Sequence, residues 1–256
     1  MATSTVLYER RGTTGIITLS RPERLNAINV DLLTDFMTQL DAARHDAEAA
    51  VIILTGAGRA FCAGEDLKET AAGKSFEHWM EEADRLQEIQ RMIMRLGKPL
   101  IAAVRGYAVG GGCEFAMSCD IRVATEDAQF GFPETGVGLT VTTAGTKLLT
   151  QLVGLGVAKE LILVGDFIDA REALRIGLVN RVVPTDRLLE TSLALAHKIA
   201  ARSPLALKLS RSAIDQGLDA SMEQTLEIEA NHLLICVAAQ SQDPYVKKRL
   251  AEMREG

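Results

Sequence analysis

The sequence lacks the marks of several large classes of protein. Its 256 residues contain no run of about 18 apolar residues, so we expect no membrane-spanning helix and no membrane partner. Residues 1–10 show neither an apolar signal core nor an Arg/Ser-rich transit pattern, which favours a cytoplasmic location. An excess of basic residues is also missing. The formal net charge of −6 argues against broad nucleic-acid binding, because such binding depends on neutralising phosphates.

Cysteine pairs with metal-ligand spacing are missing as well. The four cysteines stand at positions 62, 113, 119 and 236, and none of them forms a C-x-x-C pair. No Cys/His cluster has the spacing of a zinc site. We therefore expect no bound metal, and we expect reduced thiols that are mostly buried in the core.

What the sequence does contain is an alternation of strand-like and helix-like segments, followed by a run of helices. Apolar or alternating segments predict strands at 6–10, 14–19, 51–54, 100–104, 121–124 and 177–182. Helical spacing predicts helices at 31–47, 76–96, 114–118, 142–152, 157–163 and 170–176, and nearly throughout from residue 186. This order predicts an α/β core of repeated β-β-α turns over residues 1–190 and a C-terminal helical module over residues 191–256. Apolar residues on the late helices, such as Leu226, Leu233 and Leu234, favour packing against another subunit.

Two of the expected strands run into glycine-rich turns. The strand 51–54 leads to the stretch 55–65, and the strand 100–104 leads to the three glycines at 110–112. Glycine lets a ligand approach the main chain closely, and a turn that opens a helix leaves N–H donors free. We interpret the turns as a pair of N–H donors for one oxygen, with tight turns that bind nothing as the alternative. A phosphate loop is disfavoured because neither turn has G-K-[ST], and Phe61 stands where a dinucleotide fingerprint needs its third glycine.

Two glutamates accompany these turns. Glu114 follows the second turn by two residues, and Glu134 ends the stretch Phe130-Gly-Phe-Pro-Glu. A carboxylate between Phe132, Pro133 and Phe130 is not in the usual setting of a surface charge. Partial burial would raise its pKa and suit it to proton transfer. For either glutamate alone, a structural ion pair is an equally good interpretation.

Together these stretches resemble the crotonase superfamily, the enoyl-CoA hydratase/isomerase family. The matching segments are 21–27, 61–68, 98–114, 119–120, 128–134 and 177–185, and the resemblance covers nearly the whole chain. It implies an α/β fold, a spiral of β-β-α units with a C-terminal helical oligomerisation module. It also implies a homotrimer or a hexamer that is a dimer of trimers. Coenzyme A would enter as part of an acyl-CoA substrate, so no separate cofactor is expected.

The resemblance also implies roles for individual residues. The main-chain N–H groups of Glu65 and Gly111 would hold the thioester oxygen, and each such donor typically contributes about 3–4 kcal/mol. Glu114 would position and deprotonate the water that adds to Cβ, and Glu134 would protonate Cα. The remaining positions that match the CoA and substrate groove are Arg24, Leu25, Ala27, Ala63, Asp66, Leu67, Lys68 and Thr142.

The presence of both glutamates favours an enoyl-CoA hydratase, which adds water reversibly across the 2,3 double bond through an oxyanion-stabilised enolate. The alternatives are an enoyl-CoA isomerase or a dehydratase of a functionalised acyl-CoA. A non-catalytic acyl-CoA or RNA-binding member of the family is a third possibility of another class.

One stretch departs from the family pattern. Val141, Thr142 and Ala144 replace a proline and two glycines after the second glutamate. In hydratases the N–H at the Thr142 position helps to hold the catalytic water, so we expect a reshaped water site or acyl pocket here. Trp79 and Met80, early on the helix 76–96, are expected in the core, with the acyl pocket as the alternative.

Overall fold

The computed structural model describes residues 4–240, 242 and 244–255, so the outermost residues of the two expected regions, 1–3 and 256, lie outside it. Its larger sheet has the strand order β1-β2-β3-β4-β6-β9. The strands are β1 (Val6–Arg11), β2 (Thr14–Leu19), β3 (Val51–Gly56), β4 (Leu100–Val104), β6 (Ile121–Thr125) and β9 (Arg181–Val183). The β1–β2 pair is antiparallel, which confirms the expected hairpin, and the other pairs are parallel.

A second, smaller sheet lies beside the first. It contains β5 (Tyr107–Val109), β7 (Gln129–Gly131) and β8 (Ile168–Asp169). The chain therefore passes from β4 to β5 and from β6 to β7, one strand in each sheet, before it turns into a helix. This is the expected β-β-α order, although the three short strands were not expected as strands.

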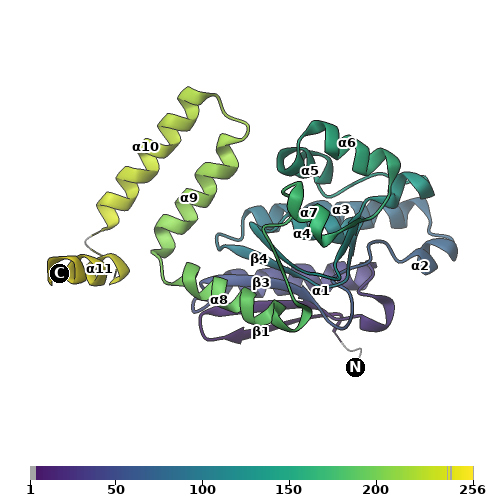
Figure 1. The fold of residues 1–256 in the computed structure, drawn as a ribbon, viewed down its shortest axis with the longest axis horizontal. Coiled ribbons are helices and arrows are strands. Elements are labelled where there is room, and N and C mark those ends of the chain that lie inside the picture. Colours follow the sequence, from purple (N-terminus) through teal and green to yellow (C-terminus); the bar gives the residue numbers. More distant parts are fainter. Residues whose placement is uncertain (1–3, 241, 243, 256) are drawn as a thin grey trace.

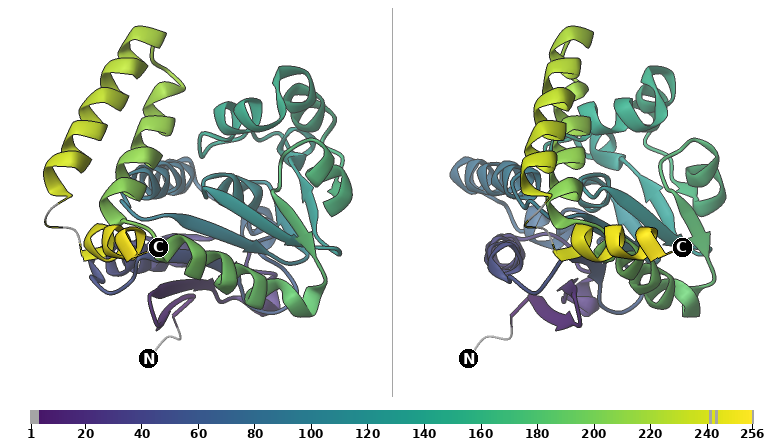
Figure 2. Two further views of the ribbon diagram at one scale, coloured as in Figure 1. Left: turned by 60° about the vertical axis from the view of Figure 1, so that its left-hand side comes forward. Right: turned by 90° about the vertical axis from the view of Figure 1, so that its left-hand side faces the viewer.

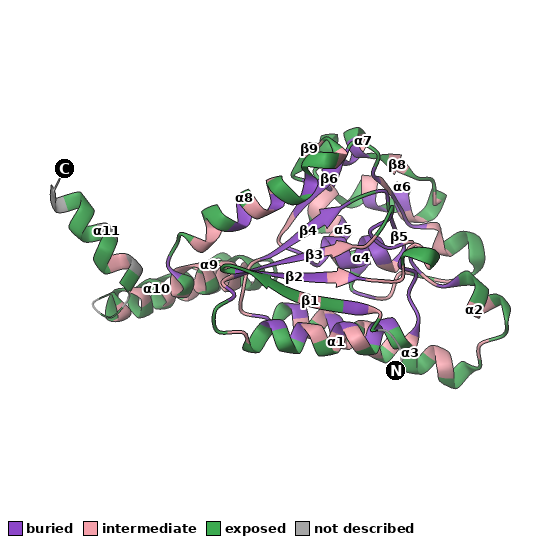
Figure 3. Ribbon diagram, turned by 90° about the horizontal axis from the view of Figure 1, so that it is seen from below, coloured by how far each residue is buried: buried purple, intermediate pink, exposed green. Residues whose placement is uncertain are grey.

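Helices cover both faces of the larger sheet because its central strands are apolar on both sides (Figures 1 and 3). Ile52 and Leu54 of β3 pack in one core cluster with residues of α1 (Val30–His45) and α3 (Phe76–Met94). Val51 and Ile53 point the other way, into a cluster with residues of α8 (Leu188–Ala200). This alternation is what a strand buried between two helical layers requires.

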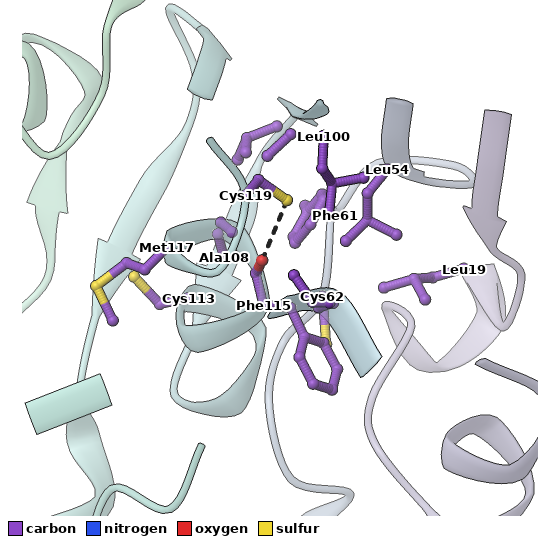
Figure 4. Close-up of a cluster of buried hydrophobic side chains, with 14 of the residues drawn as sticks. Leu19, Leu54, Phe61, Cys62, Leu100, Ala108, Cys113, Phe115, Met117 and Cys119 are labelled. Atoms are coloured by element: carbon purple, nitrogen blue, oxygen red, sulfur yellow. Dashed lines mark hydrogen bonds between the residues drawn. The ribbon is translucent and has the colours of Figure 1, made fainter. Parts of the chain in front are cut away.

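The helix α4 (Gly111–Met117) is packed into the first of these clusters (Figure 4). Its Cys113 and Phe115 are fully buried, as is Cys62 of the first glycine-rich turn. The thiol of Cys119, just after α4, donates to the carbonyl oxygen of Phe115 at 3.4 Å. The backbone of the two turns is therefore packed against the hydrophobic core, as a preorganised site requires.

The remaining helices of the core are α2 (Leu67–Ala71), α5 (Gly145–Val153), α6 (Leu155–Val164) and α7 (Ala170–Arg175). The short α2 was not expected. Helix α5 begins at Gly145 and not at residue 142, and β9 begins at Arg181 and not at residue 177, because Gly177 has φ +82° and turns the chain after α7.

The C-terminal helices α9 (Pro204–Gly217) and α10 (Met222–Ala239) form an antiparallel pair that projects from the core, followed by α11 (Pro244–Glu255) (Figure 2). We call α9, α10 and the turn that joins them the arm. The boundary expected after residue 190 falls inside α8, which packs on β3, β4 and β6, so the projecting part begins at α9. No residue of the arm is buried. Its exposed apolar side chains are Ile214, Leu218, Met222, Leu226, Leu233, Leu234, Ile235 and Val237. Across the described ranges no helix is long and apolar enough to cross a bilayer.

Candidate active site

The first glycine-rich turn is fixed against the strand that leads into the second. The N–H of Cys62 donates to the carbonyl oxygen of Tyr107 at 2.9 Å, and the N–H of Val109 donates to the carbonyl oxygen of Cys62 at 3.0 Å. Gly64 has φ +81°, and a Cβ at this position would lie 2.7 Å from the carbonyl oxygen of Val109. Only glycine therefore fits where the two turns meet.

The two expected donors, Glu65 and Gly111, are the residues that follow Gly64 and Gly110 in the sequence. A Cβ on Gly110, which has φ +53°, would lie 3.9 Å from the Cα of Gly64, so the residues before Glu65 and Gly111 face each other. Gly111 is the first residue of α4, and a helix does not use the N–H of its first residue. Gly64 and Asp66, on either side of Glu65, form main-chain hydrogen bonds with Ile28, which leaves the N–H of Glu65 directed away from Ile28. In the described part of the chain neither N–H has an acceptor.

Glu114 lies on α4 and is 2% exposed. Its carboxylate accepts three main-chain N–H groups, from Thr143 at 2.6 Å, Gly145 at 3.1 Å and Thr142 at 3.3 Å. Burial raises the pKa of Glu114 to about 7, the three N–H donors oppose this change, and the charge of Glu134 adds to it. A carboxyl group with this pKa can both accept and release a proton near neutral pH.

Glu134 lies in a 3-10 helix (Pro133–Val137), after the buried Phe130 and Phe132. Its Oε1 lies against Gly110, since a Cβ there would be 2.9 Å from this oxygen. Its Oε2 is buried and has no hydrogen-bond partner among the described residues. Burial raises the pKa of Glu134, as the sequence led us to expect. The carboxyl group is thus next to the second donor turn and able to carry a proton.

The expected groove residues fall into two groups. Leu25 and Ala27 belong to a loop that joins the first turn, because the N–H of Ala63 donates to the carbonyl oxygen of Leu25 at 3.0 Å. Arg24 is half-buried in the same loop. Leu67 and Lys68 are exposed at the start of α2. The side chain of Asp66 is 5% exposed and serves the fold, because it pairs with Arg21 at 3.1 Å and caps α2.

The departure at Thr142 has a definite structural result. Its N–H points to Glu114, but its Oγ1 donates to the carbonyl oxygen of Thr140 at 3.1 Å and so turns away from the carboxylate. Ala144 has φ 58°, a left-handed conformation that a glycine would adopt without strain. The sequence analysis does not predict the donors from Thr143 and Gly145, because both residues lie in the segment expected as the helix 142–152. The glycine at 145 is the sequence feature that could indicate a turn before α5.

Two other residues of this region have surroundings that the sequence does not predict. The ammonium group of Lys74 contacts the carboxylates of Glu65 and Glu82 and lies 4.8 Å from the ring centroid of Trp79. Met80 is 53% exposed, so the expectation that it packs in the core is wrong. No cluster of three or more His, Cys, Asp or Glu side chains suited to a metal ion occurs within the described ranges.

Comparison with known proteins decides the family. The model of the enoyl-CoA hydratase/isomerase family matches residues 9–253. The chain belongs to the enoyl-CoA hydratase/isomerase family. It is 40% identical to the short-chain-enoyl-CoA hydratase of Clostridium acetobutylicum, over 98% of each chain. It is 38% identical to the crotonyl-CoA hydratase of Syntrophomonas wolfei, over 94% of this chain and 93% of that protein.

Solved structures agree with this assignment. The crystal structure of an enoyl-CoA hydratase from Bacillus anthracis superposes with a TM-score of 0.86 at 36% identity, over 90% of this chain and 89% of the other. These comparisons confirm the expected family, the crotonase-like α/β fold and an enzyme with enoyl-CoA hydratase activity. Membership of the family also implies an acyl-CoA substrate.

Proposed function

We propose that this enzyme adds water to short 2-enoyl-CoA thioesters, with Glu114 and Glu134 as its proton-transfer groups. The observation that carries the assignment is the buried, unpartnered oxygen of Glu134 beside two unused N–H donors. The two N–H donors suit a substrate with a carbonyl oxygen, and the carboxyl group of Glu134 suits a substrate carbon that must gain a proton. The names of the relatives from Clostridium acetobutylicum and Syntrophomonas wolfei support a short acyl chain.

In the proposed reaction the thioester oxygen accepts the N–H groups of Glu65 and Gly111. Glu114 takes a proton from water as the water oxygen bonds to Cβ, and the C=C electron pair moves toward the carbonyl. The two N–H groups stabilise the negative charge that grows on the oxygen. Glu134 then gives its proton to Cα, and the next cycle requires Glu134 to regain a proton and Glu114 to lose one. This scheme uses the groups of the chain and the CoA of the substrate, and no further cofactor enters it.

The experiment measures the absorbance of the conjugated enoyl thioester with crotonyl-CoA and with a 3-enoyl-CoA. Hydration lowers the absorbance of crotonyl-CoA, whereas isomerisation of the 3-enoyl-CoA raises it. Glu114→Gln and Glu134→Gln should each lower hydration by about 10²–10⁴-fold. Loss in Glu134→Gln alone, with activity on the 3-enoyl-CoA, would assign double-bond isomerisation instead. Near-normal hydration in both variants would refute the two-carboxylate mechanism.

We also propose that the arm associates with other copies of the chain to form a trimer or a dimer of trimers. Its eight exposed apolar side chains support this, because a monomeric protein seldom leaves so many on one module. Light scattering coupled to gel filtration measures the mass directly, and a monomer at micromolar concentration would contradict the proposal. For the location we propose the cytoplasm, supported by the four free cysteines.

A further inference from the structure

A group of buried charges beside the site has no part in the reaction described above. Lys74 follows α2, and its side chain is 3% exposed. Its ammonium group contacts Oε1 of Glu65 and lies 2.7 Å from Oε2 of Glu82 on α3. Glu82 is 1% exposed. We call Glu65, Lys74 and Glu82 the ion triad.

A contribution to folding stability does not by itself explain the ion triad, because burying its charges costs free energy. Taking charges out of water costs free energy, and apolar side chains of similar volume often stabilise a fold as well or better. Oε1 of Glu82 is buried without a partner in the described chain. Burial raises the pKa of Glu82 above its usual range, since desolvation outweighs the contact with Lys74. Burial by itself lowers the pKa of Lys74, but the carboxylates of Glu65 and Glu82 raise it by more. The net pKa of Lys74 is therefore raised, and Lys74 stays charged.

One member of the ion triad, Glu65, is also one of the two expected main-chain donors. Its N–H faces the site, while its side chain contacts Lys74. The same Oε1 accepts the hydroxyl of Thr70 at 2.8 Å. The side chain therefore ties the Glu65 residue to α2 and α3, while its N–H remains free.

The first residues of this segment are also anchored by contacts outside the ion triad. Arg21 pairs with Asp66 at 3.1 Å, and the amide of Asn29 donates to Glu69 at 3.0 Å. Residues 65–74 are thus held between the loop at Arg21 and the helix α3. A donor on a segment held at both ends keeps its direction when charge develops on the substrate, which is the condition for electrostatic stabilisation.

We propose that Lys74 and Glu82 are positioning residues that keep the N–H of Glu65 aimed at the thioester oxygen. This inference rests on the proposed function, because it takes the N–H of Glu65 as a donor to the substrate. The ion triad acts through Glu65 and does not touch the reacting atoms. Its removal should therefore weaken the polarisation of the carbonyl while the binding of CoA is kept.

The test compares Lys74→Met, which breaks the link, with Lys74→Arg, which keeps a cation. A second variant, Glu65→Ala, retains the N–H donor and leaves Lys74 paired with Glu82, so it does not strand a buried charge. Arg91→Met serves as the matched control, because Arg91 forms an exposed ion pair with Glu88 on the same helix. Each protein is assayed for kcat and KM with crotonyl-CoA. Each is also mixed with 4-dimethylaminocinnamoyl-CoA, whose absorption moves to longer wavelength as its carbonyl is polarised.

Lys74→Met and Glu65→Ala should lower kcat by about 10- to 100-fold with little change in KM, as expected for a misaimed donor. Both should reduce the red shift of the bound chromophore, while Lys74→Arg restores it and Arg91→Met leaves it unchanged. A full red shift in Lys74→Met and Glu65→Ala overturns the proposal, even if kcat falls. If Lys74→Met does not fold, Glu65→Ala decides alone. A wild-type enzyme that fails to hydrate crotonyl-CoA would overturn the proposed function instead.

Discussion

Replacement of Glu114 by glutamine should change how the stability of the protein depends on pH. The pKa of Glu114 is about 7 in the folded protein, against an ordinary value of 4.5. Between these values the folded state holds a proton that the unfolded chain has released, so the unfolded state binds fewer protons. The stabilising contribution of Glu114 is therefore complete below about pH 4.5 and is lost as the pH rises through 7. The difference corresponds to about 3 kcal/mol, of which about 2–3 kcal/mol is lost between about pH 5 and pH 8.

The glutamine variant isolates this effect because its side chain is neutral at every pH. Its carbonyl oxygen can accept the N–H groups of Thr143 and Gly145, but its amide NH₂ would face the N–H of Thr142. This mismatch costs about 1–3 kcal/mol, and the cost does not depend on pH. We therefore expect Glu114→Gln to be less stable than the wild type at pH 5, and at least as stable at pH 8.

The measurement is denaturant unfolding followed by circular dichroism at four pH values. The protomer concentration is kept constant, because association through the arm would add to the apparent stability. Glu160→Gln is the control, because residue 160 is exposed on α6. It measures how a Glu→Gln substitution changes the unfolding free energy where no buried carboxyl group is lost. The quantity compared is the free energy of unfolding of the wild type minus that of Glu114→Gln. If this difference stays constant from pH 5 to pH 8, or grows in favour of the wild type, the reasoning is refuted.

Three further predictions concern the geometry of the site and the arm. Gly64→Ala should cost about 1–3 kcal/mol in unfolding free energy and most of the activity, whereas Gly73→Ala, also at positive φ but with nothing within 4 Å of its Cβ, should keep the activity. Thr142→Pro removes one N–H from Glu114 and should move the acidic limb of the pH profile of kcat/KM to higher pH, while Thr142→Ala should leave it in place. Leu233→Asp should reduce the mass measured by light scattering, and an unchanged oligomer would rule out a contact at this residue.

The regular part of the fold was predictable because its strands are long enough to show a pattern. The apolar run at Val51 and the alternation at Thr14 give β3 and β2 nearly residue for residue. Strands β5, β7 and β8 have two or three residues each, too few for periodicity to separate them from turns. Their positions depend on pairing with one another, which is a long-range property of the fold.

The candidate site was predictable only where its chemistry follows a sequence motif. Glu134 stands among aromatic residues, and Glu114 follows a glycine turn, so both could be selected from the sequence. Glu82 could not, because it lies on an amphipathic helix among charged neighbours, where a glutamate normally faces solvent. Its burial depends on Lys74, eight residues earlier and beyond the start of the helix, and no local pattern links the two.

The contact of Gly64 with Gly110 limits how this enzyme can be redesigned. The carbonyl-binding slot that we propose is formed by main chain on both sides, so exchanging side chains cannot widen it or change its donors without disturbing the backbone. The carboxylates at 114 and 134 are ordinary side chains on the same scaffold and can be replaced one at a time. If the proposed role of these N–H groups holds, new reactions are most readily obtained by replacing the side chains around the thioester and leaving the main chain of the two turns as it is.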